Sequence, residues 1–292
     1  MAFLRHIGTG TRKLENLKKN LNSDLQFQKY FKVDQSKTIT GRDESRFVYI
    51  AANYLRGIRS FIGLSKSALI EMGGSSVQIA VPRKAGLNIP FLQSFPGLGA
   101  NSAHTKFLEY FANTHHSSAA DSVENPCRMD EGGDGVFHHC YKGILESFID
   151  DFNTPEMKNS RIELSNSDKY SMKDLNFFGL EVFYYNANKY GLDGKEFSFP
   201  LFKEQAKILC DYDTQKLDQY FTNNGLYKGH DNYYRKVMCF RSVYILAFLE
   251  HGLGLNLNEG EDDSFHMEPI RKINGRKVRW TFGAFLNYKK YV

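Results

Sequence analysis

A short polar turn between two apolar segments holds the densest set of groups in this chain that could bind an anion. The run ALIEMGGSSVQIAV spans Ala68 to Val81, so an apolar segment ends in a carboxylate and a Gly-Gly-Ser-Ser turn precedes a second alternating segment. Because glycines lack side chains, backbone N–H groups can crowd around a ligand at such a turn. We predict that Gly73, Gly74 and Ser75 face a phosphate. A tight turn with a polar tip is the alternative explanation of these residues.

Polar side chains on both sides of this turn add to its chemistry. Ser76 and Gln78 supply neutral hydrogen-bonding groups, and Glu71 at the strand end could hold a metal ion through water. Upstream, Glu44 lies in the first turn of a helix expected over 43–56. An acid in that position is favourable to the helix dipole and needs no catalytic role.

The elements that must position these groups follow from the periodicity of apolar residues. We expect helices over 13–29, 43–56, after the N-cap residue Asn101, over 144–152 and from Met238 to His251, and strands over 68–72, 76–81 and 88–95. We expect residues 113–140 to form a surface excursion. After the helix over 144–152, we expect a polar loop up to about residue 173. Residues 268–288 are expected to form a basic, strand-like segment. Hairpins mixed with helices indicate an α/β or α+β fold.

Bulk composition excludes several classes of protein. The 292 residues are 41% hydrophobic and 14% aromatic, which is enough for a packed core. No apolar run approaches the roughly 18 residues that a membrane span needs. The net charge of +5 is interspersed, apart from Arg271 to Arg279, which we interpret as a solvated hairpin. We therefore expect no nucleic-acid partner and no membrane anchor within this chain.

Cys127, Cys140, Cys210 and Cys239 are the four cysteines of the chain. They show no C-x-x-C spacing, which argues against zinc and permits two disulfides in any of three connectivities. Sequential pairing, Cys127 with Cys140 and Cys210 with Cys239, closes the shortest loops. Four buried thiols in a reducing compartment are the alternative.

Taken together, the motifs resemble the apyrase, or nucleoside triphosphate diphosphohydrolase, family. Glu71 to Gln78 is similar to its signature D-L-G-G-A-S-x-Q, and Gly41 to Gly57 to its G-x-E-E-G-x-Y-x-W-I-x-x-N-Y-L-x-G. The aromatic run Phe177 to Tyr185, the stretch Cys239 to Gly254 and the Trp280-Thr281-Phe282-Gly283 ending resemble three further family regions in the same order. A sugar kinase or polyphosphatase of the same superfamily fits the last regions less well.

The resemblance implies an actin-like (RNase H-like) α/β fold of two lobes. On that basis 41–264 would form a nearly complete second lobe, and 1–40 and 265–292 would belong to a truncated first lobe. The family's opening phosphate hairpin, D-A-G-S-x-G-T-R, has no counterpart in the chain. We therefore weigh two possibilities: a nucleotide phosphohydrolase, and a weak or inactive relative with part of the nucleotide site.

The resemblance also implies a role for each candidate site residue. Glu44 would be the base that activates water, Ser76 and Gln78 would orient that water, and Glu71 would reach Mg²⁺ or Ca²⁺ through its hydration shell. Tyr184 and Tyr185 would stack on the nucleobase, although both could simply be core aromatics. The substrates would be nucleoside di- or triphosphates, and relatives of this kind work outside cells or in secretory organelles.

Overall fold

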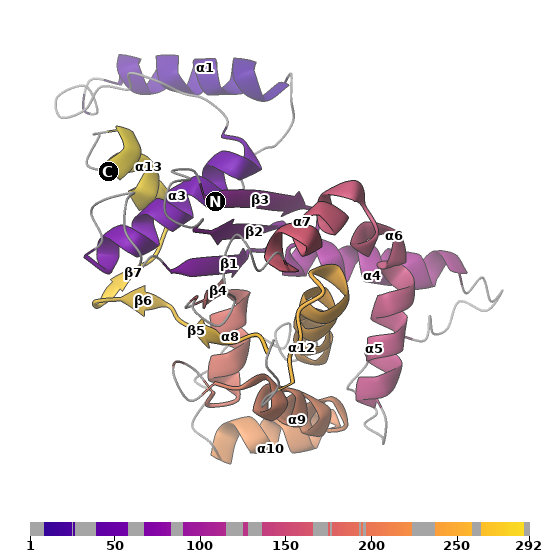
Figure 1. Ribbon diagram of the computed structural model, residues 1–292. Coiled ribbons are helices and arrows are strands. Elements are labelled where there is room, and N and C mark those ends of the chain that lie inside the picture. The colour runs from indigo at the N-terminus through magenta and orange to yellow at the C-terminus, as the bar shows by residue number, and fades with distance from the viewer. Residues whose placement is uncertain are drawn as a thin grey trace.

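A five-stranded mixed sheet forms the centre of the computed structural model, with helices packed on both of its faces (Figure 1). The structure describes residues 9–24, 26, 39–57, 67–82, 90–114, 125–127, 136–165, 175, 177–192, 194, 197–223, 237–258 and 264–288. The helices are α1 (Thr9–Ser23), α3 (Gly41–Leu55), α4 (Ala100–Thr114), α5 (Val136–Ser147), α6 (Ile149–Phe152), α7 (Pro155–Ser165), α8 (Val182–Lys189), α9 (Phe199–Cys210), α10 (Thr214–Asn223), α12 (Met238–Ala247), the π-helix η3 (Phe248–Gly252) and α13 (Trp280–Tyr288). The strands are β1 (Ala68–Met72), β2 (Ser76–Val81), β3 (Phe91–Pro96), β4 (Phe177–Glu181), β5 (Met267–Pro269), β6 (Lys272–Ile273) and β7 (Arg276–Lys277).

The strand order β3-β2-β1-β4-β5 joins an antiparallel half of the sheet to a parallel half. β1, β2 and β3 form an antiparallel meander, whereas β4 and β5 run parallel to β1. Met72 pairs with Val77 across the hairpin and with Glu181 across the parallel pair. The polar turn after β1 and the end of β4 therefore lie at the same edge of the sheet.

Alternation along the strands divides the core into two clusters. Leu69 of β1 and Ala80 of β2 pack with α3, whereas Ile70 and Ile79 face the larger cluster around α12. Because side chains on a strand alternate between faces, Glu71 lies on the same face as Leu69, and Gln78 on the same face as Ala80. The sheet thus directs both polar residues toward α3.

Local sequence and one close helix contact fix the position of α3. Thr40 and Asp43 form a reciprocal capping box at its start, and Gly57 follows its C-cap with φ of 85°. At its side lies α13, where a Cβ on Gly283 would come within 1.7 Å of the carbonyl oxygen of Phe47. The glycine therefore permits the two helices to approach each other.

Three expectations about secondary structure were wrong. The stretch expected as loop contains α7, whose Met157, Ser160 and Leu164 are buried on one face and whose first residue, Pro155, suits the start of a helix. The excursion over 113–140 gives way to α5 at Val136, and the strand-like C-terminal segment ends in a helix. Each of these helices is held by packing of a few apolar residues, which its own sequence signals only weakly.

Both disulfides have the sequential pairing. Cys127 bonds to Cys140 with an S–S distance of 2.03 Å, and Cys210 bonds to Cys239 at 2.08 Å. The second bond joins the end of α9 to the start of α12 in the main core. Within the described part of the chain, no helix is long and apolar enough to cross a bilayer.

Candidate active site

The turn between β1 and β2 is held from behind by the first turn of α4. The carbonyl oxygen of Gly73 accepts a hydrogen bond from the N–H of Ala100 at 2.9 Å, and that of Gly74 accepts one from Asn101 at 2.8 Å. Because the C=O and N–H of a trans peptide point in opposite directions, the N–H groups of Gly74 and Ser75 are directed away from α4. The turn thus presents amide donors on the side opposite the helix, as an anion site requires.

Gly99 allows this close approach of helix and turn. A Cβ at this position would lie 2.2 Å from the backbone nitrogen of Ser76 and 2.5 Å from that of Ser75. Any larger residue would push α4 away from the turn, so the conformation of the turn depends on this glycine.

A buried arginine orients an amide beside the turn. The Nη2 of Arg241 donates a hydrogen bond to Oδ1 of Asn101 at 2.8 Å, and the arginine is only 9% exposed. Since a guanidinium can only donate, this contact assigns the oxygen of the amide to the arginine and its Nδ2 to the other side. That Nδ2 lies 3.0 Å from where a Cβ of Gly74 would be. The sequence predicted Asn101 only as a helix N-cap, and it did not predict Arg241, although a lone arginine in the apolar run of α12 was a usable signal.

Gln78 links the hairpin to α3. Its Nε2 lies 2.7 Å from Oγ of Ser76, 3.1 Å from Oε2 of Glu44 and 3.5 Å from Oγ of Ser94. Ser45 secures the same contact from the helix side, because its hydroxyl donates to the carbonyl oxygen of Gln93 on β3 at 2.7 Å. The structure therefore brings together Glu44, Ser76 and Gln78, which sequence analysis had selected separately.

Glu71 lies on this same face with a buried carboxyl. Its Oε2 has no hydrogen-bond partner among the described residues. Burial, together with the nearby carboxylates of Glu181 and Glu44, raises the pKa of Glu71 to about 8. A cation would relieve both the orphaned oxygen and the repulsion between these acids, so the residues fit a divalent metal.

The donor set favours contact with a metal through water rather than directly. Across the described ranges, no three His, Cys, Asp or Glu side chains are grouped so that they could hold a metal ion. Mg²⁺ commonly keeps several of its waters and is bound by one or two carboxylates together with substrate phosphates. Glu71 therefore suits an outer contact to a hydrated ion.

Glu181 is a further acid at this edge that sequence analysis missed. It ends β4 opposite Met72 and adopts φ of 58° and ψ of −109°, a backbone conformation that residues with side chains rarely adopt. Such strain persists where the surrounding structure enforces it and is typical of functional sites. A carboxylate at the end of an apolar strand, the pattern that identified Glu71, also marks this residue.

Tyr184 and Tyr185 lie in the first turn of α8, which begins at the same sheet edge as the polar turn. Their rings are 5.5 Å apart in a T-shaped arrangement. Tyr185 is 42% exposed, and the guanidinium of Arg271 lies 5.7 Å from its ring centroid. Tyr185 is therefore at the surface, and Tyr184 is partly buried.

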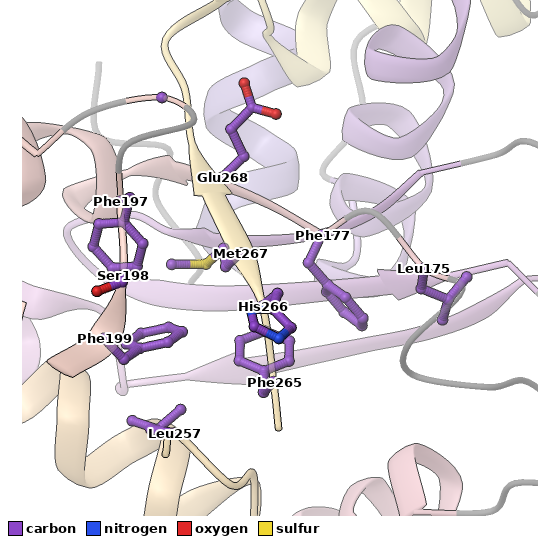
Figure 2. Close-up of a pocket in the computed structure, with 11 residues that line it drawn as sticks. Leu175, Phe177, Phe197, Ser198, Phe199, Leu257, Phe265, His266, Met267 and Glu268 are labelled. Atoms are coloured by element: carbon purple, nitrogen blue, oxygen red, sulfur yellow. The ribbon is translucent and has the colours of Figure 1, made fainter. Parts of the chain in front are cut away.

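A separate cavity lies at the opposite edge of the sheet, where β4 and β5 begin (Figure 2). It has a volume of about 230 Å³, and the rings of Phe177, Phe199 and Phe265 form much of its wall, while Glu268 points away from them. Its apolar walls hold none of the candidate site residues. The groups that could act on a phosphate are therefore gathered at the other edge.

Comparison with known proteins identifies the family. A model of the GDA1/CD39 (nucleoside phosphatase) family matches residues 91–292, well over half of the chain. The chain belongs to this family. The matched range begins at β3, so it does not include α3 or the hairpin that carries the polar turn.

Curated relatives match most of the chain, including residues before the range that the family model covers. The nucleoside-triphosphatase ntp-1 of Caenorhabditis elegans is 23% identical over 93% of this chain and 54% of its own length. The Golgi apyrase of Schizosaccharomyces pombe is 21% identical over 86% of this chain and 52% of its own length. The predicted family of apyrases and nucleoside triphosphatases is confirmed, and this GDA1/CD39 chain spans about half the length of these relatives.

Solved structures agree on the fold. A nucleoside triphosphate hydrolase from Neospora caninum superposes with a TM-score of 0.59 at 14% identity, covering 98% of this chain and 71% of that chain. A Ppx/GppA protein from Aquifex aeolicus gives a TM-score of 0.50 at 13% identity, with the same coverage of both chains. These likenesses confirm the predicted actin-like α/β class of the GDA1/CD39 chain.

Proposed function

We propose that this GDA1/CD39 chain hydrolyses the terminal phosphate of nucleoside di- or triphosphates, with Glu44 as the base that activates water. The contact between Gln78 and Glu44 at 3.1 Å, together with that between Gln78 and Ser76 at 2.7 Å, carries the proposal. An acid, an amide and a hydroxyl joined in this way can orient a water molecule and accept its proton. Family membership supports the general activity.

The turn supplies the other half of the proposed chemistry. Amide N–H groups of Gly74 and Ser75 would stabilise charge on the phosphoryl oxygens, and Gly73 permits the same close approach. Glu71 would hold hydrated Mg²⁺ or Ca²⁺ at the sheet edge. Bound there, the ion would neutralise charge on the phosphates.

Further assignments complete the proposal. Tyr184 and Tyr185 would stack on the nucleobase, since α8 begins at the same sheet edge as the phosphate turn. We retain 41–264 as the second lobe, with 1–40 and 265–292 in the first. A Golgi apyrase and ectonucleoside triphosphate diphosphohydrolases among the relatives, together with two disulfides, support a secretory lumen or the cell exterior as the location.

Phosphate release from ATP and ADP, with Mg²⁺ or Ca²⁺ present, tests the proposal. We expect Glu44→Gln to lower the rate by about 10²–10⁴-fold, the usual contribution of a general base. Glu109→Gln, an exposed acid on α4, serves as the matched control and should leave the rate unchanged. Equal rates for wild type and Glu44→Gln would contradict the assignment of the base.

A nucleotide-binding chain with little turnover is the second candidate. The observation that favours it is the single phosphate hairpin of the sequence, because each missing donor to the developing charge costs about 10²–10³-fold in rate. Saturable ADP binding without phosphate release would support this candidate. Ordinary enzymatic turnover that depends on Glu44 would rule it out.

A further inference from the structure

A second cleft lies away from the candidate active site, between α5, α9 and the π-helix η3. Its volume is about 710 Å³, within the range that small organic ligands occupy. Its wall consists of Phe137, His138, Tyr141, Lys203, Lys207, Glu250, His251, Leu255, Asn256, Leu257 and Asn258. None of these residues belongs to α3, β1 or β2, so the cleft is independent of the phosphate turn.

The carboxylate of Glu250 in this cleft has both a hydrogen-bond partner and an ion-pair partner. The hydroxyl of Tyr141 donates to Glu250 and lies 3.0 Å from Nε2 of His251. Lys203 lies 3.8 Å from the other carboxylate oxygen of Glu250. Because Glu250 already has these two partners, its charge is largely compensated within the wall.

The ammonium group of Lys207 adds positive charge beside an aromatic surface. It lies one helical turn from Lys203 on α9, and its Nζ is 5.9 Å from the ring centroid of Phe137. Glu204 lines a smaller adjoining cavity of about 230 Å³ that shares Lys203, Lys207 and Glu250 with this cleft. The cleft therefore combines two ammonium groups, one of which is paired with Glu250, and its wall includes Phe137 and Leu257.

The π-helix is an independent sign that this wall has a function. The N–H of Leu253 donates to the carbonyl oxygen of Phe248 at 2.9 Å, the spacing of a π-helix, and this geometry sets Glu250 and His251 into the cleft. Arg161 secures its end by donating to the carbonyl oxygen of Gly252 at 2.8 Å. π-Helical turns are rare and are frequent at functional sites.

We propose that this cleft binds a small ring-bearing anion, with the anionic group on Lys203 and Lys207 and the ring against Phe137. Ammonium groups donate charge-assisted hydrogen bonds to such a group, and the apolar part of the wall takes up the ring. The amide side chains of Asn256 and Asn258, which also line the cleft, provide further neutral donors. A plain inorganic anion would use only part of this surface.

Phenyl phosphate is a suitable probe for calorimetric titration of the full chain, with inorganic phosphate and phenol as partial probes. We expect phenyl phosphate to bind more tightly than either. Lys203→Gln combined with Lys207→Gln should weaken the binding of phenyl phosphate by about tenfold or more, the factor that one charged hydrogen bond contributes. Phe137→Leu should weaken the binding of phenyl phosphate but not that of inorganic phosphate.

Two controls separate binding at the cleft from general loss of positive charge and from binding at the phosphate turn. Lys142→Gln with Lys216→Gln removes the same charge from lysines that do not line the cleft and should leave the affinity unchanged. Ser76→Val alters the phosphate turn, so binding at the cleft should survive it. Absence of saturable binding, or binding that the lysine pair does not affect, would overturn the proposal, and circular dichroism would confirm that each variant is folded.

Discussion

The carboxyl of Glu71 has a protonation state that depends on its surroundings. Its pKa rises from 4.5 to about 8, chiefly because the group is buried, with Glu181 and Glu44 adding repulsion. A carboxyl whose pKa is higher in the folded state contributes stability while it is protonated, fully below its unfolded pKa. That contribution is lost as pH rises through the folded pKa. The metal-free chain should therefore lose several kcal/mol of stability between about pH 5 and pH 9.

Glu71→Gln should remove this pH dependence, because the amide stays neutral throughout. The measurement is the free energy of unfolding in urea, from acid to alkaline pH, with a chelator present. Near pH 9, Mg²⁺ or Ca²⁺ should raise the melting temperature of the wild type but not of Glu71→Gln, since a cation favours the ionised acid. Glu109→Gln is the control. Parallel pH profiles for wild type and Glu71→Gln would contradict burial as the cause.

Asn101 allows stability and nucleotide binding to be changed in opposite directions. Asn101→Asp would give Arg241 a charged partner in place of its 2.8 Å amide contact, and charged hydrogen bonds are stronger than neutral ones. The same negative charge would lie beside Gly74 and repel phosphate. We expect a melting temperature at or above that of the wild type, with affinity for ADP lower by about tenfold.

Thermal unfolding and ADP titration of the same samples test this pair of effects. Asn101→Ala provides the comparison: it removes the hydrogen bond that Asn101 accepts from Arg241 and should lower the melting temperature. If Asn101→Asp binds ADP as tightly as the wild type, the phosphate does not bind within reach of the new charge beside Gly74.

Among the elements, α3 and α13 are the pair whose contact most directly sets the site. Alanine favours a helix over glycine by about 1 kcal/mol, so Gly283→Ala should stabilise the protein if packing did not matter. The carbonyl oxygen of Phe47 would lie 1.7 Å from the new methyl group. We therefore expect the opposite, a loss of about 1–3 kcal/mol from overpacking.

Displacement of α3 would also move Glu44 relative to Gln78. Gly283→Ala should then lower phosphate release by more than its loss of stability explains at a temperature where the variant is folded. Thr281→Ala, an exposed change on α13, should affect neither quantity. A stabilised Gly283→Ala would show that the two helices separate without cost.

At the scale of the whole molecule, short-range signals explain what sequence analysis found. The capping box at Thr40 and the alternation around Gly73 are local, so α3 and the β1–β2 hairpin follow directly from the residues. The pairing of β1 with β4 joins Met72 to Glu181, more than 100 residues apart, and no local pattern encodes that register. Glu181 and Arg241 each had a local signal, a strand-end carboxylate and a lone charge in an apolar run, but their roles depend on contacts that only tertiary packing creates.

The disulfide between α9 and α12 carries the last prediction. It closes a loop of 29 residues, whereas Cys127–Cys140 closes one of 13. Since loop-closure entropy grows with loop length, Cys210→Ala with Cys239→Ala should cost about 3–4 kcal/mol and Cys127→Ala with Cys140→Ala about 3 kcal/mol. Both pairs are buried in the main core, so loop length sets the expected difference between them. Urea unfolding of both double variants measures the difference, and a larger loss from the Cys127–Cys140 pair would contradict this ordering.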